Sequence, residues 1–242
     1  MRIKLTVSYR GTSYAGWQVQ PDKPSIQGEL QAVVTRLTES VTKVTGASRT
    51  DAGVHALGQV CHFDAPRSIP TAQWMRAFER LLPEDIRVIA CEEVNGDFHA
   101  RFDARKKVYR YYIDPAPIAS PFLSLFVWHR PGLTNFDAMR VACRHLRGEI
   151  CERMFASQAE GNQDIRTIDH FSVQRDRLVV FTVKSRSFMR HAVRGMVGSL
   201  LEVGYGRRQP DEIRAMAQVV PGHPRMVKAP GQGLFLVDVQ YN

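Results

Sequence analysis

Residues 2 to 9 alternate without a break between apolar and polar side chains. The apolar members are Ile3, Leu5, Val7 and Tyr9, and the polar members are Arg2, Lys4, Thr6 and Ser8. Because successive side chains of a strand point to opposite faces, this pattern predicts a half-buried strand whose polar face meets solvent or a ligand. The chain is therefore expected to begin in a sheet that is covered on one side.

Further strand and helix patterns alternate along the chain. Helices are expected after the capping residue Ser25, over residues 71–82, after Asn135 and from the run 187–198. Strand patterns cover residues 42–45, 59–63, 86–94, 105–113, 165–168 and 178–183, and the segment 229–239 ends in a strand. Neither half has the long βαβ spacing of a purely parallel sheet, so the pattern predicts the α+β fold class.

The length of 242 residues suits one large domain or two small ones, and the Pro-rich segment 114–132 is a candidate seam. Hydrophobic residues make up 44% and charged residues 24%, as in soluble globular proteins. No apolar run is long enough to span a bilayer, and the N-terminus begins with a strand pattern instead of a signal peptide. We therefore expect a cytoplasmic protein with no membrane partner.

The formal net charge is +9, which favours polyanionic partners such as nucleic acid without identifying one. A merely basic soluble protein is the simpler alternative. The cysteines Cys61, Cys91, Cys143 and Cys151 are widely spaced and lack the companions of a zinc site. Phosphate-cradle and dinucleotide motifs are also absent from the sequence. We therefore expect no metal and no cofactor.

The run Ser48 to Ala56 places a carboxylate, Asp51, in a loop between two strand patterns. Arg49 precedes Asp51 by two residues, His55 follows it by four, and Gly53 permits a tight turn. Loops on a rigid scaffold often carry catalytic residues. The spacing alone favours an ordinary turn, in which the Asp side chain bonds its own backbone.

Two other stretches combine charge with aromatic or apolar residues. Along 105–113, Tyr109 and Tyr111 share one strand face while Arg110 lies on the other, as in an RNA-binding strand or an edge strand protected by charge. In the run 187–198, Arg190 and Arg194 are expected one helical turn apart. A solvated charged face would explain them equally well.

Several uninterrupted runs resemble the TruA family of tRNA pseudouridine synthases. The most specific is Arg49 to Ala56, and the others are residues 9–18, 25–30, 98–112, 187–198 and 229–239. The resemblance implies a pseudouridine synthase fold with two α/β-sandwich-like halves, 1–104 and 105–242, whose largely antiparallel sheets meet around a central RNA-binding cleft. It also implies a homodimer that isomerises uridines 38, 39 and 40 in the anticodon arm of tRNA.

The resemblance further implies roles for individual residues. Asp51 corresponds to the catalytic carboxylate, Tyr109 to the tyrosine that stacks on the target base, and Arg194 to the arginine that pairs with the catalytic Asp. An arginine near Asp51 would oppose the rise in pKa that burial causes, and so keep the carboxylate charged. The expected substrate-binding residues are Tyr109, Arg49, His55, Arg105, Lys106, Lys107, Arg110, Phe188 and Arg190.

The chain departs from the family pattern at 78–83 and at 149–155. Both departures lie outside the catalytic runs and concern substrate range and local packing. Two other functions remain open from the sequence. One is an RNA-binding protein without catalysis, acting as a folding chaperone; the other is a hydrolase built on Asp51 and His55.

Overall fold

The computed structural model describes residues 1–66, 68–157, 164–219 and 227–241. The chain divides into two compact units, Met1–Arg105 with Phe235–Asn242 (unit 1) and Lys106–Leu234 (unit 2). Residues 235–242, expected in the second half, group with unit 1 because the last strand pairs there. Each unit packs helices against a sheet with largely antiparallel pairing, which is the α+β class.

The sheet of unit 1 has the order β4-β1-β3-β10. Strands β1 (Arg2–Tyr9), β3 (His55–Asp64) and β4 (Ile86–Val94) pair antiparallel, β10 (Leu234–Gln240) pairs parallel with β3, and the short β2 (Thr45–Gly46) pairs antiparallel with β3. The predicted alternation of β1 is confirmed, since Ile3, Leu5 and Val7 are fully buried and their polar neighbours are not.

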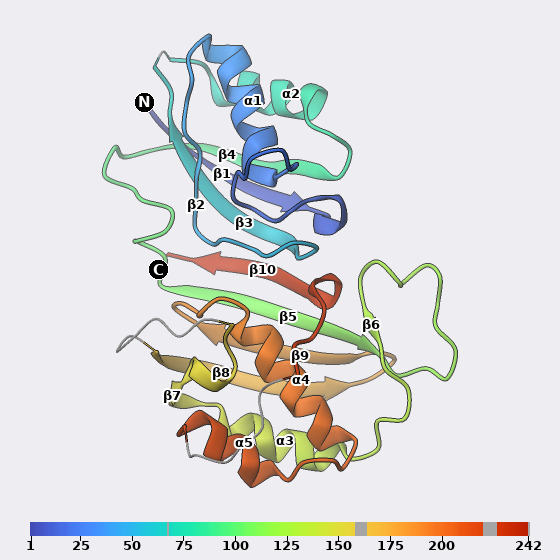
Figure 1. Ribbon diagram of the computed structural model, residues 1–242. Helices are drawn as coiled ribbons and strands as arrows, with labels where there is room; N and C mark the ends of the chain where they lie inside the picture. The colour runs from blue at the N-terminus through green and yellow to red at the C-terminus, as the bar shows by residue number, and fades with distance from the viewer. Residues whose placement is uncertain (67, 158–163, 220–226, 242) are drawn as a thin grey trace. The chain divides into compact units, whose positions relative to one another are not determined.

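Helices α1 (Ile26–Thr38) and α2 (Thr71–Leu81) cover one face of this sheet (Figure 1). Ser25 caps α1 as predicted, accepting a hydrogen bond from Gly28 N at 3.2 Å. Trp74 of α2 is completely buried and meets Phe63 of β3 edge-to-face, with ring centroids 5.0 Å apart. This core fixes β3, the strand that follows the Asp51 loop.

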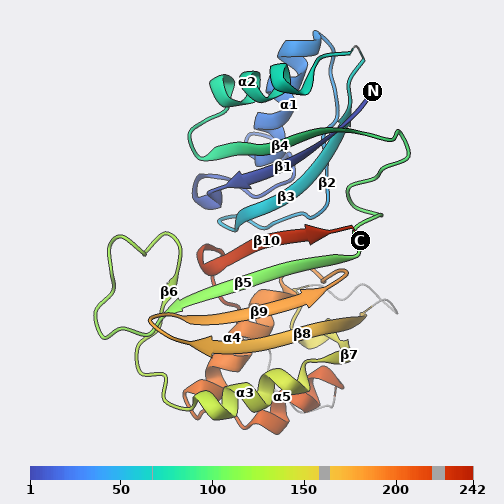
Figure 2. The same cartoon turned by 180° about the vertical axis from the view of Figure 1, so that it is seen from behind.

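The sheet of unit 2 has the order β5-β9-β8-β7. It comprises β5 (Lys106–Asp114), β9 (Val179–Ser185), β8 (Ile165–Arg175) and β7 (Gly148–Cys151), all antiparallel, and β6 (Trp128–His129) pairs parallel with β5. Helices α3 (Phe136–His145), α4 (Ala192–Gly204) and α5 (Pro210–Ala217) pack in a layer against it (Figure 2). No helix within the described ranges is long and apolar enough to cross a membrane.

Two predicted elements differ from the structure. The strand expected over 42–45 is reduced to β2, because the backbone of Val44 bonds the side chains of Gln27 and Gln31 of α1 instead of a neighbouring strand. The helix expected within 187–198 begins only at Ala192, after His191 adopts a left-handed φ of 67°. Arg190 therefore precedes α4, and the prediction of two arginines one turn apart on a helix is wrong.

Candidate active site

Asp51 lies in the connection between β2 and β3, as the sequence predicts. The loop turns at Gly53, whose φ of 75° is in the left-handed region that glycine adopts without strain. Val54 N donates to Asp51 O at 3.1 Å and closes the turn. Asp51 is half-buried and Arg49 is exposed. The loop thus presents a carboxylate near the surface on a backbone that is hydrogen-bonded on both sides.

The segment 9–17 is hydrogen-bonded to this loop and restrains it. The hydroxyl oxygens of Tyr9 and Thr50 lie 2.7 Å apart, and Trp17 N donates to Thr50 O at 3.0 Å. Gly16 forms a β-bridge with Asp51, and its φ is 110°. A Cβ at Gly16 would lie 2.5 Å from Thr50 O, so the close approach of the two backbones requires glycine.

Two buried glutamines complete the support. Gln59 of β3 accepts from Ser48 N at 3.2 Å and donates to Ser48 O at 2.8 Å, which fixes the start of the loop. Gln27 of α1 donates to Val44 O at 2.7 Å and accepts from Val19 N at 2.9 Å. The sequence analysis did not single out either glutamine, because an isolated polar residue in an apolar pattern does not reveal its partner.

His55 is almost completely buried at the end of the loop. Its Nδ1 accepts a hydrogen bond from Gly11 N at 3.1 Å, and its ring stacks on Phe235 of β10 with centroids 4.6 Å apart. This geometry assigns His55 to holding the loop against β10 and the segment after β1. It does not favour the hydrolase alternative, in which His55 would face a substrate as a base.

Tyr109 lies in unit 2, on the face of β5 that packs under the helices, and is buried. Its ring meets Phe188 edge-to-face, with centroids 5.5 Å apart and planes at 86°. Arg110 is exposed on the opposite face of the strand, as the alternation predicts. The structure thus brings Tyr109 and Phe188 together and separates Arg110 from them.

Arg194 lies in the first turn of α4 and is held by the segment before β10. Its Nε donates to Ala229 O at 2.7 Å, and Ala229 N donates to Arg194 O at 3.1 Å. A Cβ at Gly198 would overlap Val227 O, so a glycine one turn later lets this segment lie directly on the helix. The run 229–233 therefore positions the arginine.

The remaining predicted substrate-binding residues are distributed over both units. Arg105, at the end of unit 1, is exposed, and so are Lys106 and Arg190 in unit 2, whereas Lys107 is buried. Lys106 Nζ lies 3.8 Å from Asp169 Oδ2 across the sheet of unit 2. The exposed cations can contact phosphate groups. Lys107 is buried, so it could contact phosphate only after a change in the structure around it.

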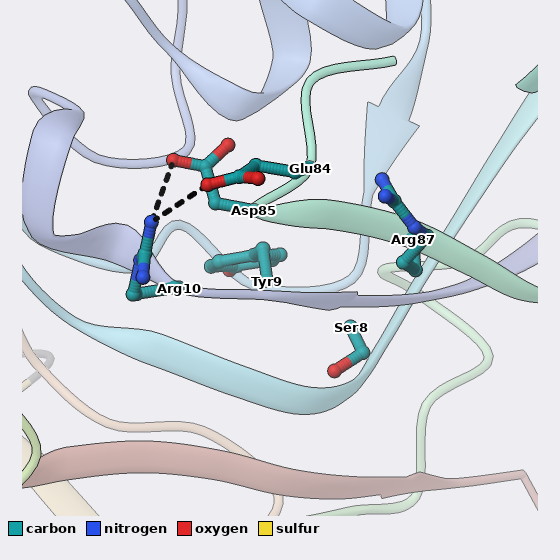
Figure 3. A pocket seen from close by; sticks show the side chains of 6 residues that line it. All are labelled: Ser8, Tyr9, Arg10, Glu84, Asp85 and Arg87. Carbon is teal, nitrogen blue, oxygen red and sulfur yellow. Dashed lines mark ion pairs between the residues drawn. The ribbon is translucent and has the colours of Figure 1, made fainter. Parts of the chain in front are cut away.

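A pocket of about 280 Å³ opens beside Tyr9 in unit 1 (Figure 3). The guanidinium of Arg10, which lines the pocket, lies 3.9 Å from Glu84 Oε1 and 4.0 Å from Asp85 Oδ2. The Tyr14 hydroxyl donates to Asp85 Oδ1 at 2.7 Å. Since these carboxylates offset the charge of Arg10, the pocket does not provide an anion site. Across the described ranges, no group of His, Cys, Asp and Glu side chains is arranged to hold a metal ion.

The tRNA pseudouridine synthase family model matches residues 5–103 and 142–242, which include the Asp51 loop, the start of α4 and the C-terminal run. The chain belongs to this family. Three relatives carry the name "tRNA pseudouridine synthase A". The protein of Geobacter sulfurreducens (strain ATCC 51573 / DSM 12127 / PCA) is 40% identical, with 99% of both chains covered. That of Brevibacillus brevis (strain 47 / JCM 6285 / NBRC 100599) is 39% identical, also with 99% of both covered.

The third relative, from Bacillus pumilus (strain SAFR-032), is 38% identical and is covered completely, as is this chain. Similarity over full length confirms the family resemblance and the fold class, so the chain is a pseudouridine synthase with an isomerase activity. The synthase scaffold therefore includes the Asp51 loop, the buried glutamines Gln27 and Gln59, and Arg194 with its hydrogen bond to Ala229.

Proposed function

We propose that the protein converts uridine to pseudouridine at positions 38, 39 and 40 of the tRNA anticodon arm, with Asp51 as the catalytic carboxylate. The reaction breaks the bond from C1′ to N1 and joins C1′ to C5. N1 gains a proton, and the hydrogen on C5 is lost to solvent, so no electrons are exchanged. An ionised carboxylate beside the ribose, a platform for the detached base and exclusion of water meet these needs.

The observation that carries the proposal is the set of hydrogen bonds that holds the Asp51 loop, in a chain that belongs to this family. Hydrogen bonds from Tyr9, Trp17 and Gln59 hold the residues on the N-terminal side of Asp51, and the turn at Gly53 fixes those after it. Such restraint keeps a reacting group in one geometry and reduces the entropy lost in the transition state.

Arg194 and Tyr109 take their proposed roles in unit 2. Arg194, whose Nε donates to Ala229 O, is proposed to pair with the Asp51 carboxylate, because a guanidinium offers a planar, two-pronged grip on a carboxylate. Tyr109, braced by Phe188, is assigned to stacking on the uracil while it turns. The carboxylate then either adds to C1′ or removes the C2′ hydrogen to give a glycal; the proposed site serves both routes.

The target uridine must leave its stack, at a cost of a few kcal/mol. The exposed cations Arg49, Arg105, Lys106 and Arg190 are proposed to offset this cost through phosphate contacts, whose strength falls as salt rises. We further propose a cytoplasmic homodimer. The apolar residues Ile118 and Phe122, in the segment after β5, are 85% and 88% exposed, and we propose that a second copy covers them.

The test is chromatography of nucleosides from tRNA that lacks the modification, digested after incubation with the protein. The expected product is pseudouridine at positions 38–40, and Asp51→Asn should produce none. Asp22→Asn is the matched control, because Asp22 is exposed with a φ of 55° that asparagine also tolerates, and it should retain full activity. Free uracil or cleaved RNA would support the hydrolase, and unchanged but bound tRNA would support the chaperone.

A further inference from the structure

The departure at 149–155 places a carboxylate inside unit 2. Glu152 begins a 3-10 turn (η2, Glu152–Met154) after β7, and its side chain has no exposed surface. Its Oε2 accepts a hydrogen bond of 2.6 Å from the backbone N–H of Met189. Its Oε1 has no hydrogen-bond partner within the described part of the chain. Burying a carboxylate costs free energy unless the group is hydrogen-bonded. The presence of Glu152 at this buried position, with a single hydrogen bond, therefore requires an explanation.

Ser157, three residues after this turn, contacts the segment 187–191 at two other points. Ser157 N donates to Arg190 O at 3.2 Å, and the Ser157 hydroxyl bonds the ring of His191. The segment is irregular, since it follows β9 and precedes α4, and His191 has a left-handed φ of 67°. An irregular backbone needs partners outside itself for its N–H groups, and Glu152 supplies the one for Met189.

This segment joins two residues of the proposed site. Phe188, adjacent to Met189, contacts the Tyr109 ring, and Arg194 follows Met189 by five residues in the first turn of α4. We propose that Glu152 is a positioning residue: by holding Met189 N–H it fixes Phe188 against Tyr109 and sets the start of the helix that carries Arg194. The inference rests on the proposed roles of Tyr109 and Arg194.

The surroundings of Glu152 favour a neutral hydrogen-bond acceptor over a charged carboxylate. Burial raises its pKa, and the hydrogen bond from Met189 and the charge of Arg166 of β8 oppose this rise only in part, so the pKa of Glu152 is about 7. A neutral acceptor of the same shape can therefore replace Glu152. Glutamine meets this requirement, whereas alanine removes the acceptor and aspartate withdraws it by one methylene.

The test compares Glu152→Gln, Glu152→Ala and Glu152→Asp by tritium release from C5-labelled tRNA at pH 7. Glu152→Ala and Glu152→Asp should lower kcat about tenfold with KM within twofold, while Glu152→Gln should keep at least half of kcat. Glu149→Gln is the control, since Glu149 is exposed on β7 and should behave as the wild type. Wild-type kcat in the alanine and aspartate variants, or equal loss in the glutamine variant, would overturn the inference.

A second measurement follows the amide itself. Hydrogen exchange of Met189 N–H, read by NMR with 15N-methionine, should be slow in the wild type and Glu152→Gln and at least tenfold faster in Glu152→Asp. If Glu152→Ala does not fold, the glutamine and aspartate variants decide the question, and equal protection in both would overturn the inference. If the wild type itself released no tritium, the proposed function would fail instead, which separates the two failures.

Discussion

The hydroxyl of Tyr9 lies 2.7 Å from the hydroxyl of Thr50, the residue directly before Asp51. Tyr9 belongs to the apolar face of β1, and its ring packs in the core of unit 1 while its hydroxyl reaches the loop. One side chain thus connects the most regular element of the unit with the loop that carries the proposed catalytic carboxylate. This contact therefore restrains the backbone next to Asp51 against the core of unit 1.

Replacement of Tyr9 by Phe should therefore weaken the loop without emptying the core. The lost hydrogen bond leaves the Thr50 hydroxyl without that buried partner, so the free energy of unfolding should fall by about 1–2 kcal/mol. Denaturant unfolding measures this loss, and tritium release should show a lower kcat. Tyr205→Phe, which removes the exposed bond from Tyr205 to Pro131 O, is the control. Equal losses in both variants would contradict a special role for Tyr9.

Gly16→Ala should destabilise unit 1 by at least about 2 kcal/mol, because alanine meets both an unfavourable φ and the carbonyl of Thr50. Gly96→Ala is the matched control, since a Cβ there has open space within 4 Å, and its stability should change by less than about 1 kcal/mol. Thermal unfolding of the two variants side by side checks the difference. Similar melting temperatures would show that the backbones can separate freely.

Arg194→Lys should reduce kcat about tenfold or more while changing the Kd for tRNA by less than threefold. Lysine keeps the charge but loses the Nε bond to Ala229 O and the planar two-pronged grip on a carboxylate. Single-turnover kinetics and filter binding measure the two quantities. Arg214→Lys, at an exposed position in the last turn of α5, is the control. Parallel losses of turnover and affinity would instead assign Arg194 to binding RNA.

Glu152 predicts a pH dependence of stability with a definite sign. Its pKa rises from 4.5 to about 7 on folding, so between these values the native state binds a proton that the unfolded state lacks. The contribution is complete below pH 4.5, declines as pH rises and is lost above 7, on the order of 3 kcal/mol in total. Glu152→Gln should accordingly gain stability relative to the wild type between pH 5 and pH 8 in denaturant unfolding. A difference that stays constant with pH would contradict it.

The sequence predicted the elements whose signal is local. The alternation in β1, the Ser25 cap of α1 and the β-branched or apolar runs of β4 and β9 depend on neighbours along the chain, and the structure has all four. The Asp51 loop was found for a similar reason, since its turn needs Gly53. The family resemblance then supplied the roles that spacing alone left open.

What the sequence did not predict depends on partners far along the chain. Residues 42–44 have the β-branched composition of a strand, but Gln27 and Gln31 take the hydrogen bonds of Val44. The start of α4 was placed too early because the bond from Met189 to Glu152 replaces a helical one. Helix α5 was missed although its signal was present, with Gln209 and Glu212 forming a capping box around Pro210.

The most direct measurement of the central claim is tritium release by Asp51→Asn on C5-labelled tRNA, with tRNA binding measured on the same preparation. Asparagine keeps the size of the side chain and the loop's backbone hydrogen bonds, but cannot carry the negative charge. We expect folded protein, a Kd for tRNA within about threefold of the wild type, and a rate of release lowered by at least about 10⁴. Release at the wild-type rate would contradict Asp51 as the catalytic carboxylate.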